Sequence, residues 1–276
     1  MSESGASRPI GIFDSGMGGL TVMRALMAKL PHESFVYLGD TARLPYGTKS
    51  ADTVSRYAAQ AANTLLRRNV KLLVIACNTA SAMALPVLEA MLAPTPVVGV
   101  IGPGAEAAVA AASGKAIAVI GTEGTVKGGA YLRAIHARAP NAEVIQQACP
   151  LFVPLAEEGM IDGDIAERVA EHYLAPLLAN ADPATLVLGC THFPVLAPML
   201  AKVIARLGKQ VVLVDSAKTT AETVASVLAG RGLAAAASSP SHVFLATDSP
   251  ERFARVGEIF LGRAPDAVEL VDLRQV

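Results

Sequence analysis

The sequence has few aromatic residues, few cysteines and almost no net charge. Its 276 residues include no tryptophan, only 4% aromatic residues, and 23 basic against 24 acidic side chains. A dedicated nucleic-acid-binding protein would show a basic excess, and one that stacks bases would need more aromatic side chains. Hydrophobic residues still make up 52% of the chain, which supplies a substantial core and excludes a mostly disordered protein.

Long hydrophobic runs are also missing. The most apolar stretch, residues 97–121, contains Glu106 and Lys115 and is broken by glycines and a proline. A membrane-spanning helix needs about 20 mostly apolar residues without such breaks. The first seven residues are polar and lack the layout of a signal peptide, so we interpret them as a frayed tail. We therefore expect no membrane partner.

Cysteine occurs three times, as Cys77, Cys149 and Cys190. A small odd number in a chain without an export signal predicts a cytoplasmic protein and argues against a framework of disulfides. The remaining question is whether any of the thiols is reactive.

Short runs of β-branched residues alternate with longer stretches rich in alanine and leucine, which is typical of a doubly wound α/β protein with a parallel sheet. Helices are expected over residues 50–68, 80–92, 164–178 and 219–228. Strands are expected over residues 10–14, 35–39, 72–76, 96–101, 116–121, 143–147, 185–189, 211–215, 242–247 and 267–271.

Two places in the chain are candidate domain boundaries. Proline and glycine interrupt the sequence over residues 94–104, and a second break falls at residues 207–210. A division there gives a first domain built from both chain ends and an inserted middle domain. Composition alone does not decide whether the chain is divided in this way.

One segment is echoed within the chain. Residues 73–79 (LVIACNT) resemble residues 186–192 (LVLGCTH): each is an apolar strand followed by a small residue, a cysteine and two polar residues. Ligands of open α/β sheets bind beyond the carboxyl ends of the strands, where Cys77 and Cys190 fall. A cysteine at the start of a helix has a lowered pKa, because the helix dipole favours the thiolate.

A cysteine after an apolar strand is more often a small buried hydrophobic residue than a reactive one. That reading suits Cys149, which we expect to be structural, but the matched context of Cys77 and Cys190 favours a function for both. Other thiol chemistries fit poorly. A cysteine phosphatase needs an arginine six residues after the cysteine, where this chain has Met83 and Leu196. A zinc site lacks a paired cysteine motif, and a redox pair would be close in sequence, so no metal ligands are predicted.

Two loops are further candidates. Residues 10–20 form a strand, a glycine-rich turn and a helix start, but the glycine spacing fits a dinucleotide-binding loop poorly. Asp14 either caps this turn or points at a ligand that the glycines allow to approach. Residues 38–47 form a long polar loop after a strand, read either as a surface turn or as a functional loop. Glu157 and Glu158, taken individually, are more typical of a solvated helix end.

Four motifs taken together resemble the glutamate racemases of the aspartate/glutamate racemase family, and they run in order over nearly the whole chain. They are residues 13–20 (FDSGMGGL), 39–47 (GDTARLPYG), 76–81 (ACNTAS) and 188–194 (LGCTHFP). The resemblance implies two similar doubly wound parallel-sheet α/β domains that face each other across a substrate cleft. We place the first domain at residues 1–99 plus 209–276 and the second at residues 100–208.

The resemblance implies interconversion of L- and D-glutamate without pyridoxal phosphate or metal, which would supply D-glutamate for peptidoglycan. By motif position, Cys77 and Cys190 would be the two acid/base residues. Asp14 would assist Cys77 and His192 would assist Cys190, while Asp40 and Glu157 match acidic auxiliaries. The substrate-binding residues would be Asp14, Ser15, Tyr46, Gly47, Asn78, Thr79, Thr191 and His192.

This mechanism agrees with the paired cysteines, because racemisation removes the α-proton from one face and delivers a proton to the other. Two alternatives stay open. The substrate of the same two-thiol mechanism could be aspartate or a hydantoin. Alternatively, the protein is a non-catalytic amino-acid-binding protein with structural cysteines. A pyridoxal phosphate enzyme is a weaker option, because Lys49 is the only lysine near a motif. The expected partner is a small-molecule substrate; whether the chain forms a homodimer is left open.

Overall fold

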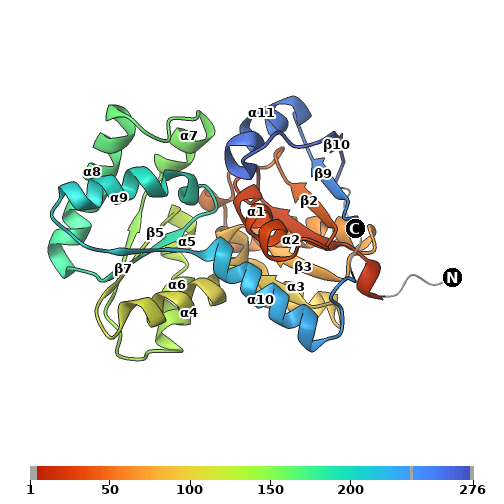
Figure 1. Ribbon diagram of the computed structural model, residues 1–276, viewed down its shortest axis with the longest axis horizontal. Coiled ribbons are helices and arrows are strands. Elements are labelled where there is room, and N and C mark those ends of the chain that lie inside the picture. Colours follow the sequence, from red (N-terminus) through yellow and green to blue (C-terminus); the bar gives the residue numbers. More distant parts are fainter. Residues whose placement is uncertain (1–4, 237–238, 274–276) are drawn as a thin grey trace.

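The computed structural model describes residues 5–236 and 239–273 and contains two parallel β-sheets that lie side by side (Figure 1). Neighbouring strands run parallel in both sheets. In spatial order, the six-stranded sheet consists of β10 (Val268–Leu270), β9 (His242–Ala246), β2 (Phe35–Gly39), β1 (Ile10–Asp14), β3 (Leu72–Ile75) and β4 (Val97–Gly99). The four-stranded sheet consists of β6 (Val144–Ala148), β5 (Ile117–Gly121), β7 (Thr185–Gly189) and β8 (Val212–Asp215).

Helices cover both sheets, and each sheet with its helices is called a half below. The helices are α1 (Leu20–Lys29), α2 (Ala51–Leu66), α3 (Asn78–Leu92), α4 (Ile101–Ala112), α5 (Glu123–Lys127), α6 (Ala130–His136), α7 (Phe152–Glu157), α8 (Asp164–Ala181), α9 (Ala197–Arg206), α10 (Ser216–Gly230) and α11 (Pro250–Leu261). Short 3-10 segments are η1 (Gly5–Ser7), η2 (Tyr46–Thr48) and η3 (Phe193–Leu196). Helices α1, α2, α3 and α11 lie on the six-stranded half, and α5 to α9 lie on the four-stranded half (Figure 1).

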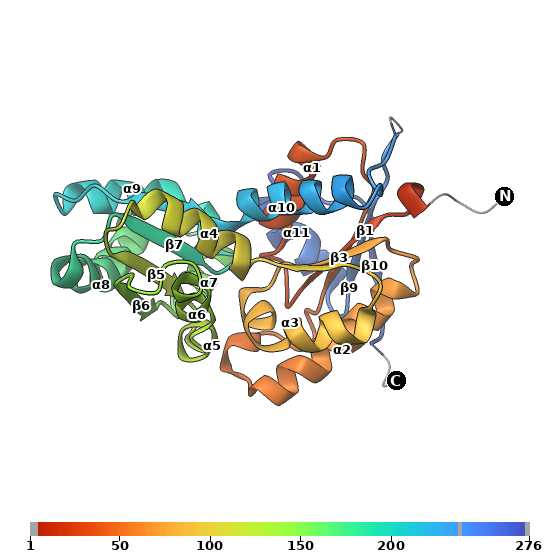
Figure 2. The same cartoon turned by 90° about the horizontal axis from the view of Figure 1, so that it is seen from below.

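The chain passes between the halves at α4 and α10. Helix α4 follows β4 of the six-stranded sheet and leads to β5, while α10 follows β8 of the four-stranded sheet and leads back to β9. Both helices lie where the halves meet, and α10 packs on α1 and on α4 (Figure 2). The domain limits at residues 99 and 208 remain a prediction. Because β8 pairs with β7, a division by sheets would place the return after Asp215 rather than at residue 209.

The two sheets share one topological feature that positions the site. In the six-stranded sheet, β2 lies on one side of β1 and β3 on the other, so the strand order reverses between β1 and β3. In the four-stranded sheet, β6 lies on one side of β5 and β7 on the other. Such a reversal leaves a crevice at the carboxyl ends of the two central strands. The segments that hold Cys77 and Cys190 follow β3 and β7, the equivalent strands of the two reversals.

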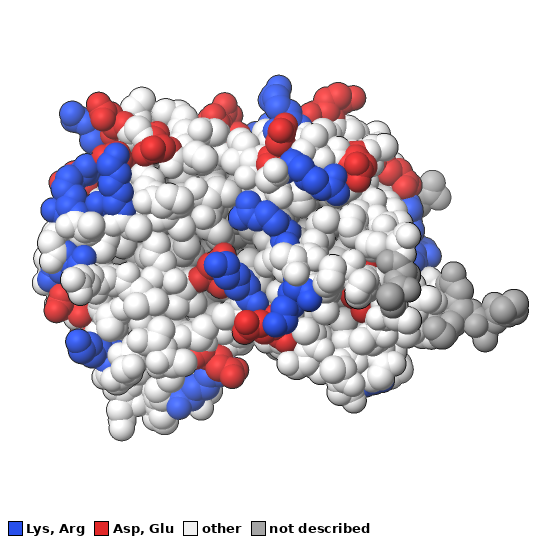
Figure 3. Space-filling model, in the orientation of Figure 1, with Lys and Arg blue, Asp and Glu red and all other residues white. Residues whose placement is uncertain are grey.

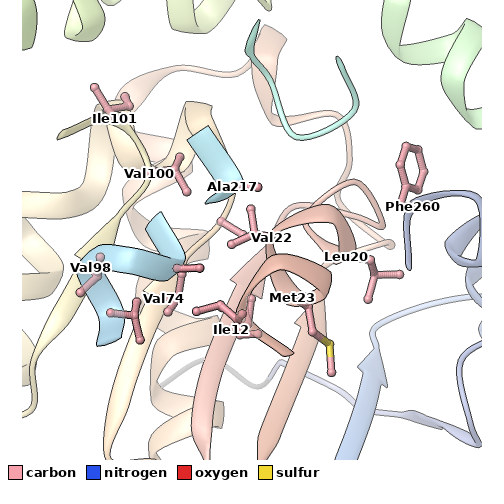
Figure 4. Packing of buried hydrophobic residues seen from close by; sticks show 14 of the residues in the cluster. Ile12, Leu20, Val22, Met23, Val74, Val98, Val100, Ile101, Ala217 and Phe260 are labelled. Atoms are coloured by element: carbon pink, nitrogen blue, oxygen red, sulfur yellow. The ribbon is translucent and has the colours of Figure 1, made fainter. Parts of the chain in front are cut away.

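The main hydrophobic core runs through both halves. Side chains of α1, such as Val22 and Met23, lie over Ile12 of β1 and Val74 of β3, and Ala217 of α10 joins them (Figure 4). The same cluster continues into the four-stranded sheet through its buried apolar residues, among them Ile117, Val119, Val187 and Val214. Burying these side chains removes apolar surface from water, which is the main driving force for folding. The two halves therefore share one hydrophobic core.

The strands expected from the sequence are all present, with ends that differ by at most two residues. Two expectations are wrong. Residues 1–4 of the expected frayed tail lie outside the described residues, but Gly5–Ser7 form η1. The segment 102–104 is expected to be a turn, but it lies within the first turn of α4, where proline is tolerated because its missing N–H needs no partner. No helix formed by the described residues is long and apolar enough to cross a membrane.

Charged side chains of both signs are intermixed on the face shown in Figure 3, and no single basic patch covers it. This agrees with the near-zero net charge of the sequence.

A buried ion pair joins distant segments of the six-stranded half. The Lys71 ammonium group is fully buried, pairs with the Glu33 carboxylate, and donates to the carbonyl oxygens of Ala6 at 2.6 Å and Leu233 at 2.8 Å. We expect Lys71→Met to lower the free energy of unfolding by about 3–5 kcal/mol, because Glu33 would keep a buried charge without its partner. Urea unfolding measures this. The exposed control Lys115→Met should change it by less than about 0.5 kcal/mol, and an equal effect of both variants would contradict the assignment.

Candidate active site

A cavity of about 190 Å³ lies between the carboxyl ends of the two sheets. Both cysteines singled out in the sequence reach it, one from each half. Cys77 and Cys190 are only 5% and 6% exposed, so their thiols face the cavity rather than open solvent. The cavity is lined by Ser15, Gly16, Leu44, Pro45, Tyr46, Gly47, Cys77, Asn78, Thr79, Thr122, Val153, Pro154, Glu157, Cys190, Thr191 and His192.

Cys77 is the N-cap of α3. Its sulfur accepts a hydrogen bond from the backbone N–H of Ala80 at 3.4 Å, and its thiol donates to Oγ of Ser15 at 3.3 Å. The sequence predicts a lowered pKa from this position, and that prediction is wrong. Burial, together with the negative charge of Asp14, raises the pKa of Cys77 to about 12 and outweighs the two hydrogen bonds. Cys77 is therefore held as a neutral thiol at neutral pH.

Asp14 ends β1 and lies beneath the glycine-rich turn, fully buried and outside the set of residues that line the cavity. Its Oδ2 accepts from the backbone N–H of Gly16 at 3.0 Å, and its Oδ1 has no partner among the described residues. Burial raises the pKa of Asp14, although His192 and backbone N–H groups of the turn oppose this. Asp14 therefore interacts electrostatically with Cys77 on one side and with His192 on the other.

Cys190 belongs to a line of interacting side chains. Its sulfur lies 3.8 Å from Nδ1 of His192, and Nε2 of the same ring lies 3.1 Å from Oε1 of Glu157. Burial disfavours the charged imidazole, but the hydrogen bonds and negative charges of Cys190 and Glu157 raise the pKa of His192 to about 10. His192 is thus an imidazolium at neutral pH, and it places a positive charge beside the sulfur of Cys190.

Glycine at position 18 makes room for His192. A Cβ there would lie 2.4 Å from Nδ1 of His192 and 2.6 Å from Oγ1 of Thr191, closer than real Cβ atoms come. The glycine-rich turn of the six-stranded half therefore packs against Thr191 and His192, which line the cavity from the four-stranded half. The sequence predicts that these glycines let a ligand approach the backbone. At position 18 the space is filled by protein side chains, while Gly16 lines the cavity.

Asp40 lies behind the cavity rather than in it. Its carboxylate is fully buried and accepts hydrogen bonds from the hydroxyl of Tyr46, Nε of Arg43 and the hydroxyl of Thr247. Tyr46 lies between Asp40 and the cavity. The structure therefore places Asp40 where it orients Tyr46.

The start of α3 provides polar groups. Oδ1 of Asn78 accepts from the Tyr131 hydroxyl at 2.8 Å, which leaves Nδ2 without a partner among the described residues. The Thr79 hydroxyl lies 3.1 Å from that of Thr122. Thr122 was not singled out in the sequence, although it follows β5 directly. The rule that led to the cysteines, a polar residue after a buried parallel strand, would have found it.

Two hydrogen bonds join the halves through residues that line the cavity. The Thr21 hydroxyl donates to the backbone carbonyl of Thr191 at 2.9 Å, and Nη2 of Arg252 lies 2.9 Å from Oε2 of Glu157. Glu157 is 12% exposed in its side chain, whereas Glu158 is exposed. The interpretation as a solvated helix end therefore holds for Glu158 and is wrong for Glu157. Nothing in the sequence links Arg252 to Glu157.

Most of the residues singled out in the sequence line the cavity. Ser15, Tyr46, Gly47, Asn78, Thr79, Thr191 and His192 line the cavity, as Cys77, Cys190 and Glu157 do, and Asp14 and Asp40 do not. Cys149 is buried outside the cavity. Among residues 5–236 and 239–273, no three His, Cys, Asp or Glu side chains are grouped so that they could hold a metal ion.

Residues 18–224 match the Asp/Glu/Hydantoin racemase family. The chain is 50% identical to a glutamate racemase of Geobacter metallireducens over 92% of this chain and 93% of that protein. It is 47% identical to a glutamate racemase of Neisseria meningitidis serogroup C over 99% and 100% of the two chains. The crystal structure of a Francisella tularensis glutamate racemase in complex with D-glutamate is similar with a TM-score of 0.90 and 39% identity, covering 97% of this chain and 98% of that one.

Proposed function

From the premise that this chain belongs to the Asp/Glu/Hydantoin racemase family, we propose that it interconverts L- and D-glutamate, with Cys77 and Cys190 as the two acid/base residues. One observation carries the mechanism: two thiols reach one small cavity from equivalent strands of two parallel sheets. Glutamate is favoured over aspartate or a hydantoin because the relatives that are 47–50% identical are glutamate racemases. The reaction needs neither pyridoxal phosphate nor metal.

In one turnover, the thiolate on one side of the bound amino acid removes the α-proton, and the thiol on the other side delivers its proton to the opposite face. The first cysteine ends as a thiol and the second as a thiolate, so the roles are exchanged for the reverse reaction. Burial and Asp14 keep Cys77 protonated, and the His192 imidazolium lies 3.8 Å from the sulfur of Cys190.

The auxiliary groups follow from the same contacts. Asp14, whose pKa is raised by burial, interacts with Cys77 and is suited to exchange a proton with it. His192 does the same for Cys190, and Glu157 orients His192. Asp40 acts at a distance by holding the hydroxyl of Tyr46.

Proton transfer alone is not enough, because the α-proton of an amino acid is weakly acidic and the carbanion must be stabilised as it forms. The first N–H groups of α3, at Asn78 and Thr79, have no partner within the helix and lie at its positive end, where they would bind the α-carboxylate. Nδ2 of Asn78 is a further donor for it. Ser15, Gly47 and Thr191 complete the expected substrate contacts. The product D-glutamate would supply peptidoglycan synthesis.

The test is the circular dichroism of L-glutamate over time with protein dialysed free of pyridoxal phosphate, in the presence of EDTA and a thiol reductant. We expect the signal to decay to zero, and the signal of D-glutamate to decay to the same end point. Decay with aspartate or a hydantoin but not with glutamate would change the substrate that we assign and leave the two-thiol mechanism in place. No decay with any of them, together with binding that survives loss of both thiols, would indicate a binding protein.

A further inference from the structure

Helix α11 of the six-stranded half contacts Glu157 and His192, the two side chains that lead to Cys190 in the four-stranded half. It lies next to α7 of the other half (Figure 1). Nη2 of Arg252 on α11 lies 2.9 Å from Oε2 of Glu157, and Oε1 of Glu157 lies 3.1 Å from Nε2 of His192. With the 3.8 Å contact between His192 and Cys190, four side chains form an unbroken line from one half to the thiol of the other.

Each oxygen of the Glu157 carboxylate has its own partner in this line. One oxygen is held by Arg252 and the other by His192, so rotation of the carboxylate about its last bond would break both contacts. Glu157 is 12% exposed and Arg252 is 39% exposed, so the ion pair is partly shielded from water at the edge of the cavity. A charge-assisted hydrogen bond of this kind fixes orientation as well as charge.

The same helix contacts His192 from a second direction. The ring of Phe260 packs edge-on against the imidazole, with centroids 5.0 Å apart and an interplanar angle of 74°. Phe260 thereby limits the position of the ring, while Arg252 limits the carboxylate to which the ring is bonded. Arg252 is not among the residues that line the cavity, so its action on the reaction is indirect.

We propose that Arg252 is a positioning residue for the racemisation, which fixes the Glu157 carboxylate so that His192 is held in place beside Cys190 when the two halves are together. The proposal rests on the proposed function, because it concerns proton transfer at Cys190. It also makes the geometry of that thiol depend on a residue of the opposite half. Opening of the cavity would then loosen the proton-transfer group as it released the ligand.

The charges around this line give a second readout. Burial opposes ionisation of Glu157, but His192 and Arg252 together lower its pKa. His192 itself faces Cys190 and Glu157 and interacts with Asp14. Removing Arg252 therefore raises the pKa of Glu157, and the acidic limb of the kcat/KM profile should move to higher pH. A loss of helix packing alone would not move this limb.

The experiment compares Arg252→Met with Arg252→Lys and with Arg255→Met, an exposed arginine of the same helix whose loss changes the net charge equally. With L- and D-glutamate as substrates, we expect Arg252→Met to lower kcat by about 10-fold with little change in KM, and to shift the acidic limb upward. Arg252→Lys should recover part of both effects, because it keeps the charge and loses the fork geometry. Arg255→Met should match the wild type.

Three results with the variants would overturn the proposal. If Arg252→Met behaves as Arg255→Met does, Glu157 needs no support from α11. If KM rises while kcat is unchanged, Arg252 contacts substrate instead of positioning a proton-transfer group. If kcat falls in proportion to a lower thermal midpoint with an unchanged pH profile, the role is structural. A wild-type protein that does not racemise glutamate overturns the proposed function and this inference together, whereas the other results leave the proposed function standing.

Discussion

Replacing either Cys77 or Cys190 with alanine is expected to lower kcat by at least about 10³-fold in both directions, because each turnover uses one cysteine as the base and the other as the acid. The two reaction directions must lose activity together. L- and D-glutamate have equal free energy, so the equilibrium constant is 1 and kcat/KM has the same value in the two directions. A variant that lacks one thiol therefore cannot remain active in one direction only.

Exchange of the α-proton in heavy water separates the two thiols. The remaining cysteine of each variant still faces one side of the substrate, so it can remove the proton of one enantiomer and return deuterium to the same face. We expect Cys77→Ala and Cys190→Ala to exchange opposite enantiomers without inverting them, which proton NMR measures.

Cys149→Ala is the matched control, because this thiol is buried outside the cavity. It should keep racemisation within about twofold of the wild type, since no proton-transfer group is lost. A single variant at Cys77 or Cys190 that racemises normally would contradict the two-thiol mechanism. Exchange of the same enantiomer by both variants would place the thiols on one face and contradict it equally.

The parts of the site that could be predicted from sequence are those that follow a buried strand. In a parallel sheet the carboxyl ends of all strands lie at one edge, so the polar residues that follow β3 and β7 lie near a crevice regardless of the loops. That reasoning located Cys77 and Cys190, and extended to β5 it would have added Thr122. The strands themselves were recognisable because strands buried on both faces read as continuous apolar runs.

What could not be predicted depends on contacts between the halves. The fit of Gly18 against His192 and the ion pair of Arg252 with Glu157 join residues that are far apart in sequence, and no local pattern marks them. The acidity of Cys77 was mispredicted for a related reason. Its helix position was correct, but the pKa depends on burial and on Asp14, and both arise from tertiary packing. The family resemblance supplied the roles of His192 and Glu157, which single-residue reasoning did not.

Replacing His192 with asparagine is expected to lower kcat/KM by about 10²-fold at pH 7–8, by the same factor for both enantiomers, because Cys190 loses the proton-transfer group beside its sulfur. The pH dependence has a definite sign. Cys190 and Glu157 raise the pKa of His192 to about 10 despite burial, so the wild type loses the imidazolium only as the pH rises toward 10. The stability that this charge contributes is complete below the ordinary pKa of about 6.5 and is lost between there and about pH 10.

We therefore expect the stability advantage of the wild type over His192→Asn, measured by urea unfolding, to shrink steadily as the pH rises through that interval. The activity ratio of the two proteins should shrink only as the pH approaches 10, because the folded wild type keeps the His192 proton until then. His172→Asn removes an exposed histidine and should match the wild type throughout. A ratio that stays constant from pH 6 to 10 would mean that His192 acts through its shape and not through its charge.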